Sequence, residues 1–388
     1  MKILVSVPAL FPFGTPIASR ILNFCRMFIS LGHEVIVFCD YLSDKKYKTS
    51  MDSALFEGIK IRYSFEERNL KSKTLKQFVT PRLIKEYLEN NKVDLMFATL
   101  AADRFSFIQR LSQKKHVPLI LEICEKYHYS NWSMGRLSPR YHKFMHCWNS
   151  EYVKADAVVA ISRLLENHFK NHNKKVVRVP SILDVGNIPF NLKRENSKTI
   201  KFVFSGALGH GKDSLAEFMI SMNNIKGKVK HSLELNIFGP SKESVRETLK
   251  ENAFVMNELG NSVHYHGRIP QNEIPLRLME YDFGIILRPQ RESSNAGFPT
   301  KLAEYMSAGL AVLANDTGDI GLYLNSSNGI LLEKKNINVI ERALLTIDLM
   351  SSEELTEMRK TARETAEINF DYRIYKEKME QLISNYYG

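Results

Sequence analysis

Short apolar strands alternate with longer amphipathic helices along the chain, and the alternation runs through twice. It starts at residues 2–7, breaks at 181–197, where Asp, Gly, Asn and Pro interrupt the periodicity, and restarts at Lys201. Strands separated by helices are typical of parallel sheets covered on both faces. At 388 residues, the chain also exceeds the roughly 250 residues that one hydrophobic core usually supports. We therefore predict an α/β protein with two doubly wound, Rossmann-like domains.

The apolar segments give the expected order of elements in each domain. The predicted strands are 2–7, 35–39, 95–100, 119–123, 157–161 and 176–179, then 201–205, 233–238, 263–266, 283–287, 310–315 and 329–332. We expect an N-terminal domain at 1–185, a C-terminal domain at 186–370 and a charged terminal helix at 371–388. Because ligands of such folds bind at the carboxyl ends of the strands, two sheets that face each other predict a ligand cleft between them.

Residues 299–308 contain the signals of a complete helix. Pro299 suits the first helical position, and Gly309 suits the position just past the end. The helix start faces a predicted loop at 293–297, where backbone N–H groups and the Lys301 ammonium are suited to hold a phosphate. Glu304 follows one turn later on the same face and can accept hydrogen bonds from sugar hydroxyls. Phosphate beside ribose predicts a nucleotide site.

This stretch, from Asn295 to Val312, resembles the donor-binding signature of the retaining glycosyltransferases of family 4, which have the GT-B fold. In that family two glutamates frame the signature: the second binds the donor ribose, and the first contacts the transferred sugar. Glu304 matches the second, whereas Ala296 stands where the first is expected. The residues that the resemblance places against the donor are Asn295, Ala296, Gly297, Phe298, Pro299, Thr300, Lys301 and Glu304.

The resemblance extends in order and spacing over residues 200–333 and implies two further donor contacts. Gly206 and Lys212 belong to a glycine-rich loop between a strand and a helix, which is suited to hold the donor diphosphate, with Lys212 as a catalytic cation. An ordinary turn with a solvated lysine is the alternative. The family usually has an arginine where Ala207 stands, so we expect Lys212 and Lys301 to share the diphosphate charge. Arg268 stands at the position where the family contacts the base. A surface arginine without a ligand contact is an equal alternative.

In the N-terminal half, candidate residues follow two strands. Gly14 lies in the first loop, where the resemblance implies a close approach to the donor phosphate; a plain turn glycine is the alternative. Glu122, Glu125 and His128 come at the carboxyl end of the strand at 119–123. Any of these three is suited to orient an acceptor hydroxyl, and we take Glu122 and His128 as catalytic candidates. Solvated side chains without a role are the alternative.

Positive charge is concentrated in the N-terminal half. Residues 1–190 contain 29 Lys+Arg and 17 Asp+Glu, a balance of +12, and residues 191–388 contain 25 and 26, a balance of −1, which sum to the +11 of the chain. Such an excess predicts an anionic partner. No zinc pattern, RNP-type strand or lysine-rich tail appears, so we expect no nucleic-acid partner. The segment 127–148 mixes aromatic and basic residues, which suits either core packing or an anionic membrane surface.

Other classes of site and location find less support in the sequence. There is no Asp-x-Asp pair of the kind that holds a divalent ion under a diphosphate, so we expect no metal and no cofactor. His142 and His146 have metal-ligand spacing but no third ligand pattern, which favours a helix face. Residues 1–8 are too short and strand-like for a signal peptide, and no run reaches the 18 apolar residues of a membrane span. We expect a cytoplasmic protein, peripheral on the inner membrane.

The prediction is thus a retaining, metal-independent glycosyltransferase. It would move a sugar from a nucleotide-sugar, with UDP or GDP as the nucleotide, to a hydroxyl of a glycan or a lipid-linked oligosaccharide in surface polysaccharide assembly. A sugar-nucleotide epimerase of the same fold and a non-catalytic nucleotide-binding relative are the alternatives. Lys212→Ala is expected to lower turnover strongly without affecting folding, because the preorganised charge that stabilises the departing diphosphate would be reduced.

Overall fold

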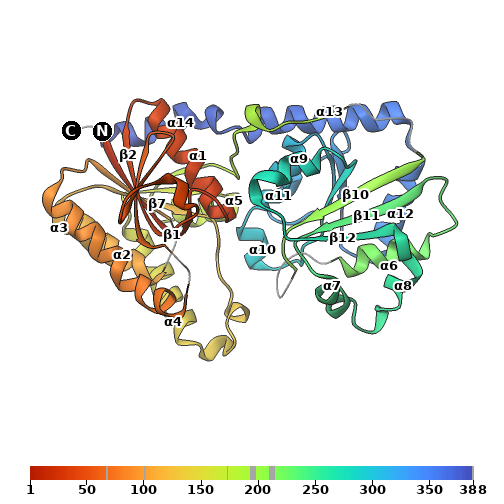
Figure 1. Ribbon diagram of the computed structural model, residues 1–388, viewed down its shortest axis with the longest axis horizontal. Helices are drawn as coiled ribbons and strands as arrows, with labels where there is room; N and C mark the ends of the chain where they lie inside the picture. The colour runs from red at the N-terminus through yellow and green to blue at the C-terminus, as the bar shows by residue number, and fades with distance from the viewer. Residues whose placement is uncertain (67–68, 100–101, 173, 193–197, 209–214, 387–388) are drawn as a thin grey trace. The chain divides into compact units, whose positions relative to one another are not determined.

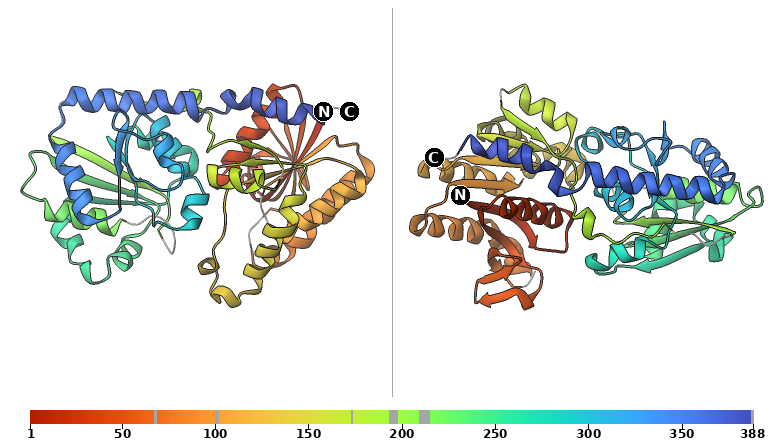
Figure 2. Two further views of the ribbon diagram at one scale, coloured as in Figure 1. Left: turned by 180° about the vertical axis from the view of Figure 1, so that it is seen from behind. Right: turned by 90° about the horizontal axis from the view of Figure 1, so that it is seen from above.

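The computed structural model describes residues 1–66, 69–99, 102–172, 174–192, 198–208 and 215–386. The chain forms two compact units, each with its own sheet of mainly parallel strands (Figure 1). The first unit consists of Met1–Ile182 together with Tyr372–Gly388, and the second of Leu183–Asp371. These junctions lie at 182/183 and 371/372, whereas the sequence suggested 185/186 and 370/371. Helices cover both faces of each sheet (Figures 1 and 2).

The sheet of the first unit has the strand order β3-β4-β5-β2-β1-β6-β7-β8-β9. Its strands are β1 (Lys2–Phe11), β2 (Glu34–Leu42), β3 (Lys48–Ser50), β4 (Ser53–Phe56), β5 (Ile59–Phe65), β6 (Leu95–Thr99), β7 (Leu119–Ile123), β8 (Ala157–Ala160) and β9 (Lys175–Arg178). The β3/β4 and β4/β5 pairs are antiparallel, and the other pairs of neighbours are parallel. The strands predicted from the sequence are present, with Leu100 outside the described residues. The three strands at one side of the sheet, β3, β4 and β5, were missed.

Helix α1 shows how local sequence builds the first unit. Thr15 caps it, because its Oγ1 accepts a hydrogen bond from the Ala18 N–H at 3.2 Å, and Pro16 occupies the first turn. Phe24 and Phe28 are fully buried against Phe97 of β6, with ring centroids 5.2 and 5.4 Å away. The helices of this unit are α1 (Pro16–Ser30), α2 (Leu70–Asn90), α3 (Ala102–Lys115), α4 (Pro139–His146), α5 (Arg163–Lys170) and α14 (Lys376–Ser384).

The C-terminal residues belong to the core of the first unit, although the second unit precedes them in the chain. The turn η11 (Tyr372–Tyr375) and α14 place Met379, Leu382 and Ile383 in the same hydrophobic cluster as α1 and β1. Met379 and Ile383 are fully buried. The first unit is therefore discontinuous in sequence.

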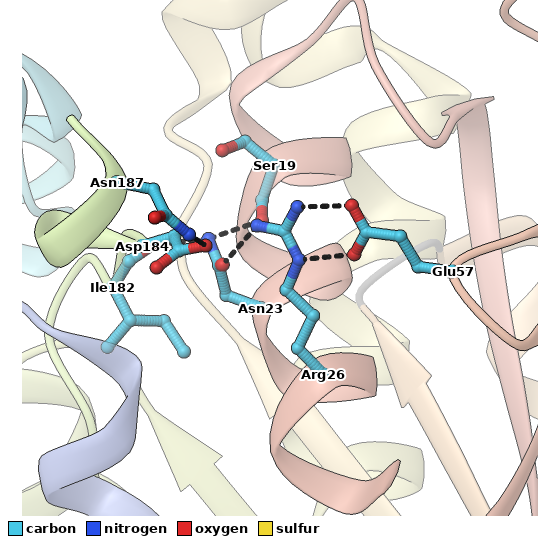
Figure 3. A network of polar contacts seen from close by, with 7 residues as sticks. All are labelled: Ser19, Asn23, Arg26, Glu57, Ile182, Asp184 and Asn187. Carbon is cyan, nitrogen blue, oxygen red and sulfur yellow. Dashed lines mark hydrogen bonds and ion pairs between the residues drawn. The ribbon is translucent and has the colours of Figure 1, made fainter. Parts of the chain in front are cut away.

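A polar network anchors α1 to the last residue of the first unit before the chain enters the second (Figure 3). The Asn23 amide donates to the carbonyl oxygens of Ser19 at 3.0 Å and Ile182 at 3.1 Å. Its Oδ1 accepts from Arg26 Nη1 at 3.1 Å, and Arg26 forms two hydrogen bonds with Glu57, at 2.7 and 2.8 Å. The exit of the chain from this unit is thus fixed to the helix that follows the first loop.

The second unit has a six-stranded sheet of order β12-β11-β10-β13-β14-β15 in which all neighbours are parallel. Its strands are β10 (Thr199–Ser205), β11 (Ser232–Phe238), β12 (Val263–Gly267), β13 (Phe283–Ile286), β14 (Ala311–Asn315) and β15 (Gly329–Leu332). Its helices are α6 (Ala216–Asn224), α7 (Lys242–Leu249), α8 (Val255–Leu259), α9 (Ile274–Leu278), α10 (Glu292–Ala296), α11 (Thr300–Ser307), α12 (Ile337–Asp348) and α13 (Ser352–Asn369). Each predicted strand is present. This order is that of a Rossmann-like sheet, whose ligands bind at the carboxyl ends of the strands.

Two buried arginines of α13 hold the C-terminal end of α11. Arg359 Nε donates to the Gly309 carbonyl at 2.9 Å, and Arg363 Nη1 donates to the Ser307 carbonyl. The same side chains reach the start of the second unit, where Arg363 donates to the carbonyls of Val185 at 3.0 Å and Ile188 at 2.9 Å. Cations at a helix C-terminus stabilise it through the helix dipole. The orientation of α11 is therefore fixed at its far end.

Candidate functional site

Helix α11 is fixed on the sheet by Tyr305. The Tyr305 hydroxyl accepts a hydrogen bond at 2.9 Å from the N–H of Ser205, the last residue of β10. Its ring packs over Gly284 of β13, where an added Cβ would lie 2.1 Å from the ring carbon Cδ2. The ring is fully buried. Glycine at position 284 thus lets the helix lie directly on β13, and the hydroxyl aligns the helix with the carboxyl end of β10.

Lys301 lies one turn before Tyr305 and therefore reaches the same strand end. Its ammonium is 3.8 Å from the centroid of the Phe204 ring, a cation–π contact. Its side chain crosses Gly206, where an added Cβ would lie 2.4 Å from Cε and 2.6 Å from Nζ. The structure thus brings together Lys301 and Gly206, two of the residues predicted to bind the donor. The positive charge is held at the end of β10 by packing.

Glycines end three neighbouring strands at this edge of the sheet. Gly206, Gly239 and Gly267 follow or close β10, β11 and β12, and each has a positive φ. The Gly206 N–H donates to the Phe238 carbonyl at 3.0 Å, and the Gly239 N–H donates to the Gly267 carbonyl at 2.7 Å. An added Cβ at Gly239 would lie 2.1 Å from the Gly206 oxygen. The missing side chains therefore let the strand ends pack directly against one another and against the Lys301 side chain.

Glu304 is a partly buried carboxylate on the same helix face as Lys301. Burial raises its pKa, and the Lys301 charge partly opposes that effect. Among the described residues, no side chain or backbone group donates a hydrogen bond to the Glu304 carboxylate. A carboxylate in this condition is a strong acceptor for ligand hydroxyls, because a hydrogen bond to the charged form offsets the cost of burial.

The start of α11 differs slightly from the expectation. Pro299 is the N-cap, with φ −73° and ψ 109°, and the helix begins at Thr300 rather than at Pro299. The Pro299 side chain provides no capping hydrogen bond at this end. The C-terminus also differs by one residue from the prediction: the helix ends at Ser307 with Ala308 as its C-cap, and Gly309 adopts a positive φ of 75° just beyond it. The N-terminus carries the positive end of the helix dipole beside Lys301.

The expectation that 293–297 forms a loop was wrong, because this segment contains the short helix α10 with Gly297 as its C-cap. Asn295 holds the turn after β14, where its Oδ1 accepts from the Gly318 N–H at 3.0 Å. Ala296 is fully buried, and the Phe298 ring packs against Tyr323 and Phe370, with centroids 5.5 and 5.8 Å away. These contacts hold the segment that leads into α11 in this conformation.

Two residues at this edge were missed in the sequence. Arg288 follows β13, where its backbone N–H donates to Asn315 Oδ1 at 2.7 Å and its Nη1 donates to the Ser294 carbonyl at 3.1 Å. Asn315 ends β14, is fully buried and also donates to the Arg288 carbonyl at 3.0 Å. Their position directly after parallel strands was the available signal. Arg288 adds a second type of cation, a guanidinium, to the strand ends near α11.

At the other side of the edge, Arg268 is exposed just after β12. Beside it His266 stacks on Phe238, with ring centroids 4.3 Å apart and an interplanar angle of 12°, and its Nε2 contacts Asn236 Oδ1 at 2.8 Å. Burial, followed by the nearby His264 and Arg277, lowers the pKa of His266. The imidazole is therefore neutral near pH 7 and offers a flat, uncharged surface to a ligand. The sequence analysis named Arg268 but not His266.

Lys212, the predicted catalytic cation, lies outside the described residues. Its assignment stays a prediction from the sequence. The described part of the loop ends at Leu208, two residues after Gly206.

In the first unit, Glu122 lies near the carboxyl end of β7, as expected from the sequence. Its side chain, however, is fully buried. Its Oε1 accepts from Arg20 Nε at 2.6 Å, and its Oε2 accepts from the Thr99 hydroxyl at 2.6 Å. Arg20 also donates to the carbonyls of Val179, at 2.9 Å, and Pro180. Both carboxylate oxygens are thus engaged in an ion-pair network that ties α1 to the sheet, which favours a structural role over an acceptor contact.

The other candidates of the first unit lie in loops at the carboxyl edge of its sheet. Gly14 follows β1 and has a φ of 102° that favours glycine; an added Cβ would lie 2.6 Å from the Leu10 side chain. His128 caps the turn η2 (Tyr129–Asn131), its Nδ1 lying 2.9 Å from the Ser130 hydroxyl. Glu125 is exposed. These residues are accessible, unlike Glu122.

Within the described ranges, no group of three or more His, Cys, Asp or Glu side chains is placed to hold a metal ion. None of the helices in the described part of the chain combines the length and apolar character needed to cross a membrane.

Several solved structures match the chain over nearly its full length. Sucrose-phosphate synthase from Thermosynechococcus elongatus matches with a TM-score of 0.74 at 13% identity, over 99% of this chain and 98% of that one. HepE from Anabaena, in complex with UDP and glucose, has a TM-score of 0.68 at 14% identity, over 99% of each chain. A glycosyltransferase from Rickettsia africae has a TM-score of 0.67 at 16% identity, over 99% and 98%. These likenesses show the fold.

Comparison with curated protein sequences finds no match. Family models do match both units. The model described as Glycosyltransferase Family 4 matches residues 17–186, and the model described as Glycosyl transferases group 1 matches residues 199–347. Together they cover well over half of the chain, with one model on each Rossmann-like domain. The chain therefore belongs to the family 4 glycosyltransferases, which have the GT-B fold.

Proposed function

We propose that this protein is a retaining, metal-independent glycosyltransferase that takes its sugar from a nucleotide-sugar. The acceptor is a hydroxyl of a glycan or of a lipid-linked oligosaccharide, in the assembly of a surface polysaccharide. The observation that carries the donor half of the proposal is the placement of Lys301 across Gly206, with the Glu304 carboxylate one turn further along α11. This pairs a cation for phosphate with an acceptor for ribose hydroxyls.

The diphosphate fits at the end of β10. There the Lys301 ammonium, which lies across Gly206, and the N-terminus of α11 supply positive potential. The ribose then lies toward Glu304. The base extends toward β12, where His266 is stacked on Phe238 and Arg268 follows the strand. HepE, a protein of similar fold, was solved with UDP-glucose, which supports a uridine nucleotide.

Catalysis in this proposal rests on stabilising the leaving diphosphate. Charge develops on its oxygens as the bond between the anomeric carbon of the sugar and the diphosphate breaks. Fixed cations beside that position lower the barrier because they need no reorganisation. Lys301 supplies one such cation, and Lys212 is the predicted second. The lysines and the helix dipole supply positive charge where other glycosyltransferases use a divalent ion. Retention at the anomeric carbon is part of the proposal and is supported by the resemblance to the retaining family.

A second function is favoured by one specific observation. Ala296 is fully buried at the position where the family signature has its first glutamate, so the contact of that carboxylate with the transferred sugar is missing. A relative that binds nucleotide but transfers no sugar would tolerate this loss. The two functions predict the same nucleotide binding and differ only in turnover.

Thermal unfolding with nucleoside diphosphates and nucleotide-sugars, in the presence of EDTA, tests the donor site. A ligand that binds only the folded protein raises its melting temperature. The expected result is a shift with a uridine or guanosine diphosphate that is lost in Glu304→Gln and in Lys301→Met. The exposed neighbours in the same unit provide matched controls, Glu333→Gln and Lys334→Met, which keep the shift. No shift with any nucleotide would contradict the proposal.

Turnover then separates the two functions. A nucleotide-sugar that shifts the melting temperature is incubated with a panel of glycan and lipid-linked acceptors, and the anomeric configuration of the product is determined by NMR. Transfer with the donor configuration preserved supports the retaining enzyme. Inversion contradicts retention, and nucleotide binding without transfer or donor breakdown supports the non-catalytic relative.

A further inference from the structure

The chain between β7 and β8 makes a long excursion from the body of the first unit (yellow in Figures 1 and 2). It contains η2, a second turn η3 (Gly135–Leu137), α4 and the π-helical turn η4 (Cys147–Glu151). We define its outer part, residues 129–143, as the tip. The excursion leaves the carboxyl end of β7, the edge of the sheet at which ligands of such folds bind.

Contacts between aromatic side chains hold the excursion in a defined conformation. The ring of Tyr127 lies 5.8 Å from that of Trp132 and 5.3 Å from that of Phe144, both in edge-to-face contact. The Trp132 ring also contacts Tyr141, with centroids 5.6 Å apart. At the base, Phe144 and Trp148 are buried. Such packing fixes the tip in one conformation, so that its outward residues form a defined surface.

The outward surface of the tip combines apolar and cationic side chains. Leu137 is 78% exposed and Met134 is 59% exposed. Arg136 and Arg140 are also exposed, and the Arg136 guanidinium lies 4.7 Å from the centroid of the Tyr129 ring. No described acidic side chain forms an ion pair with either arginine. The sequence contains no Asp or Glu from Lys126 to Ser150. This surface is therefore apolar and wholly positive.

We propose that the tip binds the surface of a lipid bilayer that contains anionic lipids. Leu137 and Met134 enter the boundary between headgroups and acyl chains, while the long side chains of Arg136 and Arg140 reach the lipid phosphates. Charge complementarity selects an anionic surface. A single-stranded nucleic acid fits less well, because it stacks its bases on exposed aromatic faces, whereas the rings of the tip pack mainly against one another.

The position of the tip suggests a role for membrane binding, and this role rests on the proposed function. Membrane binding at the carboxyl edge of the first sheet would bring a lipid-linked acceptor to the loops that contain Gly14 and His128. The contact itself depends on the tip alone and does not require donor binding. The two proposals are therefore tested by different measurements.

Co-sedimentation of the full-length protein with vesicles tests the contact. Vesicles of phosphatidylcholine alone are compared with vesicles that also contain phosphatidylglycerol, and binding is expected only to the latter. R136Q/R140Q should weaken it about 30-fold, because each Lys or Arg near an anionic surface contributes roughly a fivefold change in affinity. M134S/L137S should weaken it on the order of tenfold through lost apolar burial.

Matched controls remove the same groups from the second unit. K334Q/R342Q removes two exposed charges, and L349S/I368S removes two side chains that are 68% and 71% exposed. Both are expected to sediment like the unchanged protein. All variants should melt at the same temperature, since the substituted side chains are exposed.

Two outcomes would overturn the proposal. In one, the tip variants sediment with anionic vesicles as well as the controls do. In the other, single-stranded RNA binds more tightly than the vesicles and M134S/L137S has no effect on either, which would make the surface a polyanion site. The UDP-induced thermal shift is measured in parallel on each variant. If the unchanged protein shows no UDP-induced shift but still binds vesicles through the tip, that result would contradict the proposed function only.

Discussion

At the scale of single residues, Glu304 links the candidate site to pH. Burial raises its pKa above the ordinary 4.5, so the folded protein holds this proton more tightly than the unfolded chain. Ionisation of Glu304 therefore costs folding free energy. The cost is absent below pH 4.5, grows as the pH rises toward the folded pKa and is constant above it. Bound ribose hydroxyls would reverse this cost by donating hydrogen bonds to the carboxylate.

We therefore predict that Glu304→Gln stabilises the ligand-free protein at neutral pH. The amide keeps the shape of the side chain and carries no charge to be buried. Melting temperatures of both proteins, measured from about pH 4 to about pH 8, should diverge as the pH rises. Glu333→Gln, an exposed control in the same unit, should show no such trend. A constant difference between Glu304→Gln and the unchanged protein at all pH values would show that Glu304 titrates alike in the folded and unfolded states.

At the scale of elements, the position of α11 depends on the pairing of Gly284 with Tyr305. Gly284→Ala would place a Cβ 2.1 Å from the Tyr305 ring and force the helix away from β13. Overpacking of this kind costs about 1–3 kcal/mol of unfolding free energy. The displaced helix would also carry Lys301 away from Gly206, so the nucleotide-induced thermal shift should fall. Urea unfolding measures the first effect, and a UDP titration measures the second.

A double-mutant cycle provides the control for this prediction. Tyr305→Leu removes the ring from above position 284, although it also removes the hydroxyl that accepts from the Ser205 N–H. Gly284→Ala should then cost less in the Tyr305→Leu background than in the unchanged protein, because the two sites are in contact. Equal costs in both backgrounds would mean that the ring does not set the position of the helix.

At the scale of the whole molecule, the two units differ in their dependence on the C-terminus. The second unit is continuous, whereas the core of the first includes Tyr375, Met379, Leu382 and Ile383 from beyond the second. Each such side chain contributes roughly 1.5–3 kcal/mol when fully buried, so removal of all four would cost about 6–12 kcal/mol, which is comparable to the roughly 5–15 kcal/mol that stabilises a typical domain.

A chain that ends at Asp371 is therefore predicted to lose the cooperative unfolding of the first unit and to keep that of the second. Circular dichroism during heating, combined with limited proteolysis, would show protected fragments from the second unit only. UDP should still protect those fragments, because Lys301, Gly206 and Glu304 lie in the second unit. A protected first unit in the truncated chain would contradict the assignment of the terminal helix to its core.

Local signals in the sequence determined the fold class and, to within one residue, the C-terminal end of α11. The alternation of strands and helices and the glycine at position 309 act over a few residues, so they can be read without knowledge of the rest of the chain. The edge strand β3 was missed because its three residues are all exposed and show no apolar alternation. Tertiary structure decided which predicted residues meet. Glu122 pairs with Arg20 across 102 positions, and Ser205 with Tyr305 across 100. Such partners are set by the order of strands in the sheet, which no local pattern specifies.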